Sequence, residues 1–150
     1  MLHKTGDIQV NVITCSNTLP VLGGMNPQST QYNANDTVYQ TTMCLGSSIS
    51  FGVYPYDPNS SQNLNLTWNN GIPTAAFTIS NNNTPNVYGA FSWTPTQNNV
   101  SNTPHCFTAT ITDYACPYFG TQTYSYCITV KGMWVDLGPD TLLCKGESYT

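Results

Sequence analysis

The sequence is poor in charge. It has three basic residues, all lysines, and seven acidic ones, so 7% of its 150 residues are charged and its net charge is −4, whereas about a quarter of the residues in a typical soluble domain are charged. Binding to nucleic acid or to an anionic membrane surface is therefore not expected. No apolar run approaches the roughly 18 residues that span a bilayer. Solubility must come from Asn, Thr, Ser, Gln and Gly, a composition that suits extracellular β proteins.

Helical periodicity is also missing, because no segment repeats apolar residues at the interval of an α-helix. The chain has instead short stretches that alternate apolar and polar residues, separated by turns rich in Asn, Gly and Pro. The predicted strands are residues 48–53, 64–68, 75–80, 88–93, 106–113 and 123–130. Six or seven short strands with frequent turn signals predict an all-β fold, specifically an immunoglobulin-like β-sandwich.

The last two predicted strands indicate their own pairing. If they form a hairpin with Cys106 opposite Cys127, then Phe107 lies beside Tyr126 and Thr108 beside Ser125. This register gives one apolar face, one polar face and two cysteines that are close enough to bridge. We therefore expect a hairpin with a cross-strand Cys106–Cys127 disulfide.

Six cysteines in 150 residues indicate an oxidising compartment. A zinc site is the alternative, but the sequence has no C-x-x-C pair, and neither His3 nor His105 has the spacing of a ligand. The N-terminal residues lack the apolar stretch of a signal peptide. We therefore expect a piece of a longer secreted chain.

The predicted domain organisation has four parts. Residues 1–14 are expected to be the last strand of a preceding module, because their alternation resembles that of residues 126–130. Residues 15–43, rich in Asn, Thr, Gln and Ser, are expected to be a connector or edge segment. Residues 44–132 form the immunoglobulin-like sandwich, and residues 133–150 the first strand of a following module.

Several motifs together resemble a known family. They are Asp57-Pro, residues 64–68 (Leu-Asn-Leu-Thr-Trp), 71–73 (Gly-Ile-Pro), 91–95 (Phe-Ser-Trp-Thr-Pro), 110–113 (Thr-Ile-Thr-Asp) and 128–130 (Ile-Thr-Val). This set resembles the cadherin-like or immunoglobulin-like repeat of bacterial surface proteins. Together with Cys116-Pro and residues 135–147, it looks like the giant adhesins of Bacteroidetes, including gliding-motility adhesins exported by type IX secretion.

The resemblance implies a non-catalytic module in an extracellular filament on the cell surface. Its partners would be neighbouring modules of the same chain and a surface polysaccharide or other extracellular ligand. The family also suggests a second disulfide, Cys44–Cys116, on the premise that the start of the first strand and the loop of the last hairpin share one end of the sandwich. Cys15 and Cys144 would then pair outside this sandwich. The rival pairing is Cys15–Cys44.

No cofactor is predicted, although calcium is a candidate ligand because many cadherin-like repeats bind it. Asp57, Asn59 and Asp113 lie in predicted turns and carry the oxygen ligands that Ca²⁺ prefers. The family's richer Asp-x-Asp run is replaced here by Tyr-Asp-Pro-Asn. The same side chains would serve equally well as caps of turn N–H groups.

A sugar-binding face is a further hypothesis. Its aromatic candidates are Trp68, Trp93, Tyr54, Tyr56, Tyr118 and Phe119, of which the two tryptophans are expected to face the core. Catalysis is not expected, because the two histidines and seven acids are scattered and suggest neither a triad nor a carboxylate pair. The alternative functions are therefore a carbohydrate-binding module of a secreted enzyme and a viral or phage fibre domain.

Overall fold

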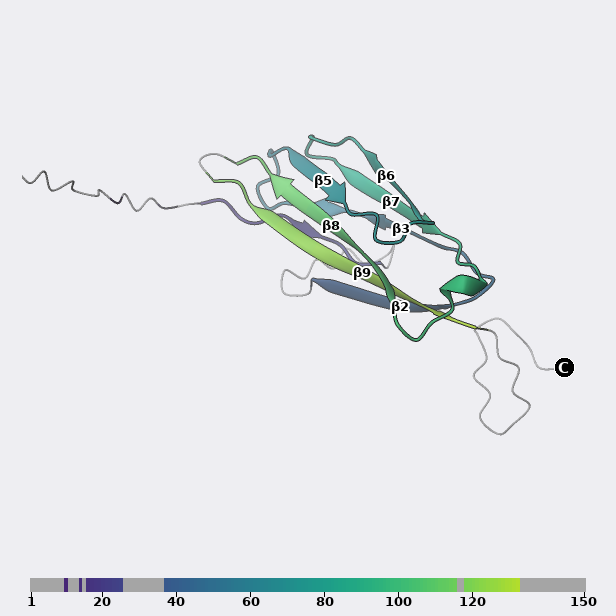
Figure 1. Cartoon of the computed structure of the whole chain (residues 1–150). Coiled ribbons are helices and arrows are strands. Elements are labelled where there is room, and N and C mark those ends of the chain that lie inside the picture. The colour runs from purple at the N-terminus through teal and green to yellow at the C-terminus, as the bar shows by residue number, and fades with distance from the viewer. Residues whose placement is uncertain (1–9, 11–13, 15, 26–36, 116–117, 133–150) are drawn as a thin grey trace, which may run out of the picture.

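The computed structural model describes residues 10, 14, 16–25, 37–115 and 118–132. They form a sandwich of two β-sheets with a two-stranded ribbon at one end (Figure 1). One sheet has the order β2-β9-β8-β5 and comprises Val38–Cys44, Thr121–Lys131, His105–Asp113 and Leu64–Trp68. The other has the order β3-β7-β6 and comprises Ile49–Val53, Tyr88–Trp93 and Ala76–Ser80. The ribbon pairs β1 (Val21–Leu22) with β4 (Pro55–Tyr56), and a 3₁₀ turn, η1, covers Gln97–Asn99.

The core lies between the two sheets and is filled by side chains from every second residue of the strands, those that face the opposite sheet. Along β8, Phe107, Ala109 and Ile111 are fully buried, and their neighbours are partly exposed. Phe107 stands at the centre, because its ring lies 4.6 Å from that of Phe91 in the opposite sheet and 5.0 Å from that of Tyr126 in β9. The alternation read from the sequence thus separates core from surface, as a half-buried strand requires.

The strand predictions are confirmed for β3, β5, β6, β7, β8 and β9, with boundaries that differ by two residues or fewer. The predicted hairpin register is also confirmed, with Cys106 opposite Cys127 and Phe107 opposite Tyr126. The two sheets and their strand order are those of an immunoglobulin-like sandwich. The described part of the chain contains no helix with the length and apolar character of a membrane crossing.

β2 was not predicted as a strand, although it adds a full edge to the larger sheet. It begins at Val38, inside the segment expected to be a connector or edge, and runs parallel to β9 from Val38↔Ser125 to Cys44↔Lys131. Its outward residues are polar or exposed and its inward face is only half-buried, so apolar alternation is weak. The sandwich therefore starts before residue 44, the boundary predicted from the sequence.

Residues 17–25 also belong to the sandwich. Leu22 is fully buried, Val21 is 7% exposed, and the N–H of Gly23 donates to the carbonyl oxygen of Tyr54 at 3.0 Å. This segment closes the end of the sandwich at which β8 finishes and β9 begins, and we call this end the N-terminal end. The described chain joins the sandwich there and leaves it at the opposite end, after β9 (Figure 1).

Candidate functional site

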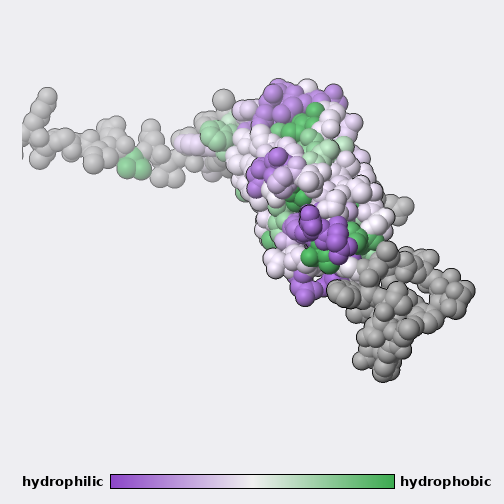
Figure 2. All heavy atoms as spheres, turned by 45° about the vertical axis from the view of Figure 1, so that its right-hand side comes forward, coloured by the Kyte–Doolittle hydropathy of each residue, from purple (hydrophilic) through white to green (hydrophobic). Residues whose placement is uncertain are grey.

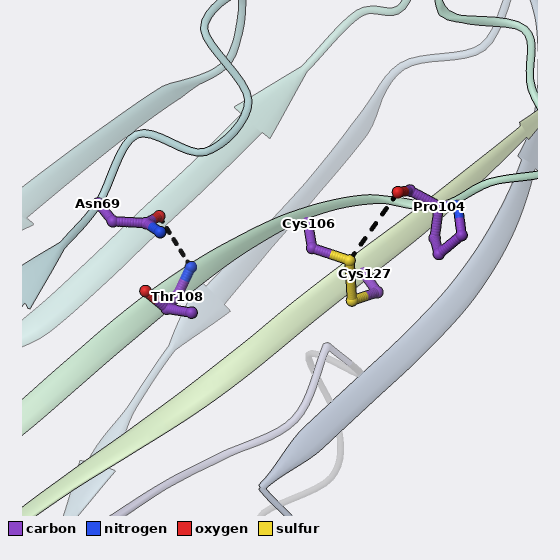
Figure 3. Close-up of a disulfide and its surroundings, with 5 residues drawn as sticks. All are labelled: Asn69, Pro104, Cys106, Thr108 and Cys127. Carbon is purple, nitrogen blue, oxygen red and sulfur yellow. Dashed lines mark hydrogen bonds between the residues drawn. A yellow bond between two sulfur atoms is a disulfide. The ribbon is translucent and has the colours of Figure 1, made fainter.

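The Cys106–Cys127 disulfide joins β8 and β9 on the outward face of the larger sheet (Figure 3). The two Cα atoms are 4.1 Å apart, a spacing close to that of directly opposed residues that do not exchange backbone hydrogen bonds. Farther along the same face, the hydroxyls of Thr110 and Thr123 lie 2.8 Å apart. The sequence places these residues together because one register aligns every second residue of both strands.

Asn69 fastens the disulfide hairpin to the neighbouring strand β5. Its Oδ1 accepts a hydrogen bond from the backbone N–H of Thr108 at 2.9 Å (Figure 3). The same oxygen accepts a second one from the backbone N–H of Gly71 at 3.0 Å. The backbone N–H of Asn69 in turn donates to the carbonyl oxygen of Thr108. The end of β5 is thereby held to β8 by a side chain as well as by the strand ladder.

Cys44 is also disulfide-bonded. It lies opposite Lys131, the last residue of β9, whereas the β8–β9 turn lies between Asp113 and Thr121, at the other end of β9. The premise that the start of the first strand and the loop of the last hairpin share one end of the sandwich is therefore wrong for Cys44, because β2 runs parallel to β9. Both candidate partners, Cys116 and Cys15, lie outside the described residues, as does Cys144.

A buried polar cluster occupies the N-terminal end of the sandwich, and Asp113 is at its centre. This carboxylate is fully buried at the end of β8. Its Oδ1 accepts hydrogen bonds from the backbone N–H groups of Gly120 at 2.7 Å and Ala115 at 3.1 Å. Its Oδ2 accepts one from Asn17 Nδ2 at 2.9 Å. Asp113 thus caps the β8–β9 turn and holds the N-terminal segment.

Asp57 lies in the same cluster, and one of its oxygens has no partner among the described residues. Its Oδ1 accepts a hydrogen bond from the backbone N–H of Asn59 at 2.7 Å, whereas its Oδ2 is buried and accepts none. Gln62 repeats this pattern, because its Nε2 donates to Asn17 Oδ1 at 3.0 Å and its Oε1 is buried without a donor. Burial, together with the nearby charge of Asp113, raises the pKa of Asp57 above its ordinary value of 3.8, despite the opposing Asn59 hydrogen bond.

These oxygens fit a hard cation. Two buried acceptors without donors belong to the same cluster as a second carboxylate, and a positive charge between them would relieve both the desolvation and the repulsion between Asp57 and Asp113. Ca²⁺ takes carboxylate and amide oxygens in flexible geometry, with water completing the shell. Asp57, Gln62 and Asp113 would hold it. Asn59 accepts instead from the backbone N–H of Thr18 at 3.0 Å. Within the described residues no group of three or more His, Cys, Asp or Glu side chains could hold a metal, so amide oxygen would be needed.

The aromatic candidates separate into core and surface. Trp93 is 2% exposed and donates through its indole N–H to Thr74 Oγ1 at 2.9 Å. Trp68 is half-buried and stacks on Phe77 at 5.1 Å. The remaining four are about half exposed or more: Tyr54, Tyr56, Tyr118 and Phe119. The structure adds an exposed tyrosine that the sequence did not single out, Tyr88, whose ring is stacked beside that of Tyr54.

His105, the one histidine in the described residues, makes contacts that stabilise the fold. One of its ring nitrogens, Nε2, lies 2.8 Å from the carbonyl oxygen of Asn99 in η1, and its ring meets Trp93 edge-on at 5.4 Å. These contacts tie the start of β8 to the turn before it. The geometry therefore gives His105 a structural role.

Comparison with known proteins supports the fold. No protein-family model matches this sequence, and no curated protein matches it. Among solved structures, the sialic-acid-binding region of a Streptococcus sanguinis SK1 adhesin, bound to 3'sLn, aligns over 79% of this chain and 31% of its own, with 12% identity and a TM-score of 0.50. An endo-fucoidan hydrolase from glycoside hydrolase family 107 aligns over 81% of this chain and 15% of its own, with 16% identity and a TM-score of 0.48. The M1 domain from titin aligns over 76% of this chain and 96% of its own, with 12% identity and a TM-score of 0.44.

The chain spans less than a third of the first two structures. At these identities the similarity concerns the fold alone, and the similarity to the adhesin region is consistent with an all-β immunoglobulin-like sandwich.

Proposed function

We propose that this chain supplies a non-catalytic structural and adhesive repeat module of a long extracellular bacterial surface protein. The observation that carries the proposal is the arrangement of strands β2 and β9. β2 and β9 lie side by side and run parallel over seven residue pairs, while the described chain joins and leaves the sandwich at opposite ends (Figure 1).

This arrangement suits a module under tension. Where no bond from Cys15 carries the load directly to Cys44, a pull along the chain draws β2 toward the N-terminal end and β9 toward the other. The hydrogen bonds between the two strands are then loaded in shear, all at once. Before that load reaches β2, the N-terminal segment must be detached from Asp113 and from the core, where Leu22 is fully buried. Unfolding under force therefore requires many contacts to break together.

The finer assignment is a module of the kind found in gliding-motility adhesins of Bacteroidetes, exported by type IX secretion to the cell surface. It is supported by the motif resemblance, by the low charge and by the disulfides. The partners would be neighbouring modules in one filament, with residues 1–14 and 133–150 as parts of those modules. These segments lie outside or almost wholly outside the described residues.

Single-molecule force spectroscopy tests the mechanical proposal. The Cys44→Ala variant, in which no bond from Cys44 can bypass β2, would be pulled from its two termini and, as the matched control, from Ser47 and the C-terminus, with the handle at an unnatural amino acid. Ser47 is exposed just after β2, so the control pull separates β2 from β9 one pair at a time. We expect a clearly higher unfolding force between the termini. Equal forces in the two geometries would contradict the proposal.

Calcium binding is a second proposal, favoured by the two buried oxygens of Asp57 and Gln62 that lack donors. A ligand that binds only the folded state raises the melting temperature with concentration. We expect Ca²⁺ to raise it and a chelator to lower it, with little effect of Mg²⁺. The Asp57→Asn variant should lose the response. If neither Ca²⁺ nor chelator shifts the wild-type melting temperature, the site does not bind calcium.

A further inference from the structure

The outer face of the smaller sheet is largely exposed and carries no charged residue in its three described strands, β3, β6 and β7. The outward positions hold mainly small side chains, among them Ser50, Thr78, Ala90 and Ser92, and these four are exposed. Strand positions usually favour β-branched and aromatic residues, so strand propensity does not explain serine and alanine at three of these four positions.

Two tyrosines stand at one edge of this face. Gly52 pairs with Ala90. Two residues farther along the chain from Gly52 lies Tyr54, just after the end of β3, and two residues before Ala90 lies Tyr88, the first residue of β7. Their rings are 6.1 Å apart with an interplanar angle of 17°, and the residues are 51% and 38% exposed. The two rings therefore form one near-parallel aromatic pair that solvent can reach.

Gly52 determines where the Tyr54 ring lies. A Cβ at this position would stand 2.6 Å from Cζ of Tyr54, so the ring folds back over the glycine and does not project away from the sheet. Glycine inside a strand often marks a close approach to the backbone. Here the approaching group is the tyrosine ring, and any larger residue at position 52 would displace it.

We propose that this face binds a neutral polysaccharide, with the sugar rings stacked on Tyr54 and Tyr88 and their hydroxyl groups bonded to the serine and threonine hydroxyls beside them. Exposed aromatic rings pack against the C–H faces of sugars, and their phenol groups remain hydrated. Because the face has no charge, it offers no partner to uronate, sulfate or sialate groups. The ligand class is therefore an uncharged glycan chain.

A second protein copy suits this face less well. Protein interfaces bury a central group of large anchors in a close-packed patch. Here Tyr54 and Tyr88 lie together at one edge, and the other outward residues of β3, β6 and β7 are small. The inference rests on the proposed function only in that an adhesive module needs a contact surface. Binding and unfolding force are separate measurements, so either proposal can fail without the other.

The test is affinity electrophoresis of the full oxidised chain in gels that contain hydroxyethylcellulose, laminarin, mannan or dextran, with polygalacturonate as the charged comparison. We expect retardation by at least one neutral polysaccharide and none by polygalacturonate. Tyr54→Ala and Tyr88→Ala should each weaken binding about tenfold, the scale of one aromatic contact. Gly52→Val should also weaken binding, because it leaves both rings in the sequence but moves one.

Tyr118→Ala is the matched control, since this tyrosine is 52% exposed but belongs to the β8–β9 loop. It should bind like the wild type, and all variants should keep the wild-type melting temperature within a few degrees. The proposal is overturned if no neutral polysaccharide retards the protein, or if Tyr118→Ala weakens binding as much as Tyr54→Ala. It is equally overturned if the wild type forms a dimer in sedimentation that Tyr54→Ala abolishes, because the face would then belong to a second copy.

Discussion

The Tyr126 hydroxyl donates a hydrogen bond of 2.8 Å to the carbonyl oxygen of Gly23, across 103 residues of sequence. Tyr126 is fully buried in the middle of β9, and burial raises the pKa of its phenol, so the hydroxyl remains a donor throughout the neutral range. Tyr39 makes the equivalent contact with the carbonyl oxygen of Leu22 at 2.9 Å. Two tyrosines of the larger sheet thus hold the N-terminal segment from inside the sandwich.

Tyr126→Phe should destabilise the protein by about 2 kcal/mol, because the carbonyl oxygen of Gly23 would remain buried without its donor. The measurement is chemical denaturation at neutral pH. Tyr114→Phe is the matched control, since Tyr114 is 57% exposed and should change stability by less than about 0.5 kcal/mol. Equal effects of the two variants would show that the Gly23 contact does not stabilise the fold.

Leu22→Ala should cost about 3 kcal/mol of unfolding free energy, the usual effect of removing a fully buried leucine side chain. Leu19→Ala, three residues earlier and 48% exposed, should cost less than about 1 kcal/mol. Comparing the two variants shows whether residues 17–25 fold with the domain or only connect to it. If Leu22→Ala were as mild as Leu19→Ala, the segment would not be part of the cooperative unit.

Removing the cross-strand disulfide with Cys106→Ala/Cys127→Ala should lower stability by about 3 kcal/mol, from the chain entropy of a loop of this size. The double variant is preferable to a reducing agent, because reduction would also break the disulfide of Cys44. Under force, with Cys44→Ala in both proteins so that no bond from Cys44 bypasses this segment, the variant should release about 70 Å of additional length, since the bond spans a sequence separation of 21. An unchanged length would mean that the disulfide is not formed in the wild type.

The buried carboxyl of Asp57 predicts a pH dependence with a defined sign. Its pKa is raised in the folded state, so the folded protein binds a proton more tightly than the unfolded chain does. In chelator, the stability of the wild type relative to Asp57→Asn should therefore be greatest at low pH and fall as pH rises from about 4 toward neutrality. Denaturation of both proteins across this range checks it. A difference that stays flat or grows with pH would be contrary to a desolvated carboxyl.

Adding Ca²⁺ at neutral pH provides a linked measurement. A bound cation favours the ionised form of Asp57, so it should restore the stability that wild type loses between low and neutral pH. Asp57→Asn should gain little. This outcome would show that the raised pKa of Asp57 and its buried oxygen without a donor both result from a cation site.

The composition of the surface explains how the protein can be hydrated with so few charged residues. In the face that Figure 2 shows, hydrophobic patches are small and are separated by weakly polar and strongly hydrophilic areas. Uncharged polar residues occupy the outward strand positions, and threonine pairs such as Thr110–Thr123 and Thr112–Thr121 exchange hydrogen bonds across the ladder. Hydroxyl and amide groups therefore supply the hydration that charged residues supply in other domains.

The sequence by itself determined the sandwich and the β8–β9 hairpin. In both strands every second residue is apolar, and one register buries Phe107 and Tyr126 together. In that register the two cysteines lie opposite each other. Local turn chemistry was equally readable. The Asn81–Asn83 turn, for example, uses Asn81 and Asn83 at positive φ, which asparagine tolerates better than most residues.

Only the tertiary structure decided which segments distant in the sequence lie beside one another. The parallel course of β2 places Cys44 next to Lys131, and no local pattern distinguishes a parallel partner from an antiparallel one. The burial of Leu22, the meeting of Asp57 with Asp113 and the pairing of Tyr54 with Tyr88 each join residues at least 30 positions apart. Such contacts depend on strand order and on the ends at which loops converge, and these are properties of the assembled sandwich, which alternation within one strand does not encode.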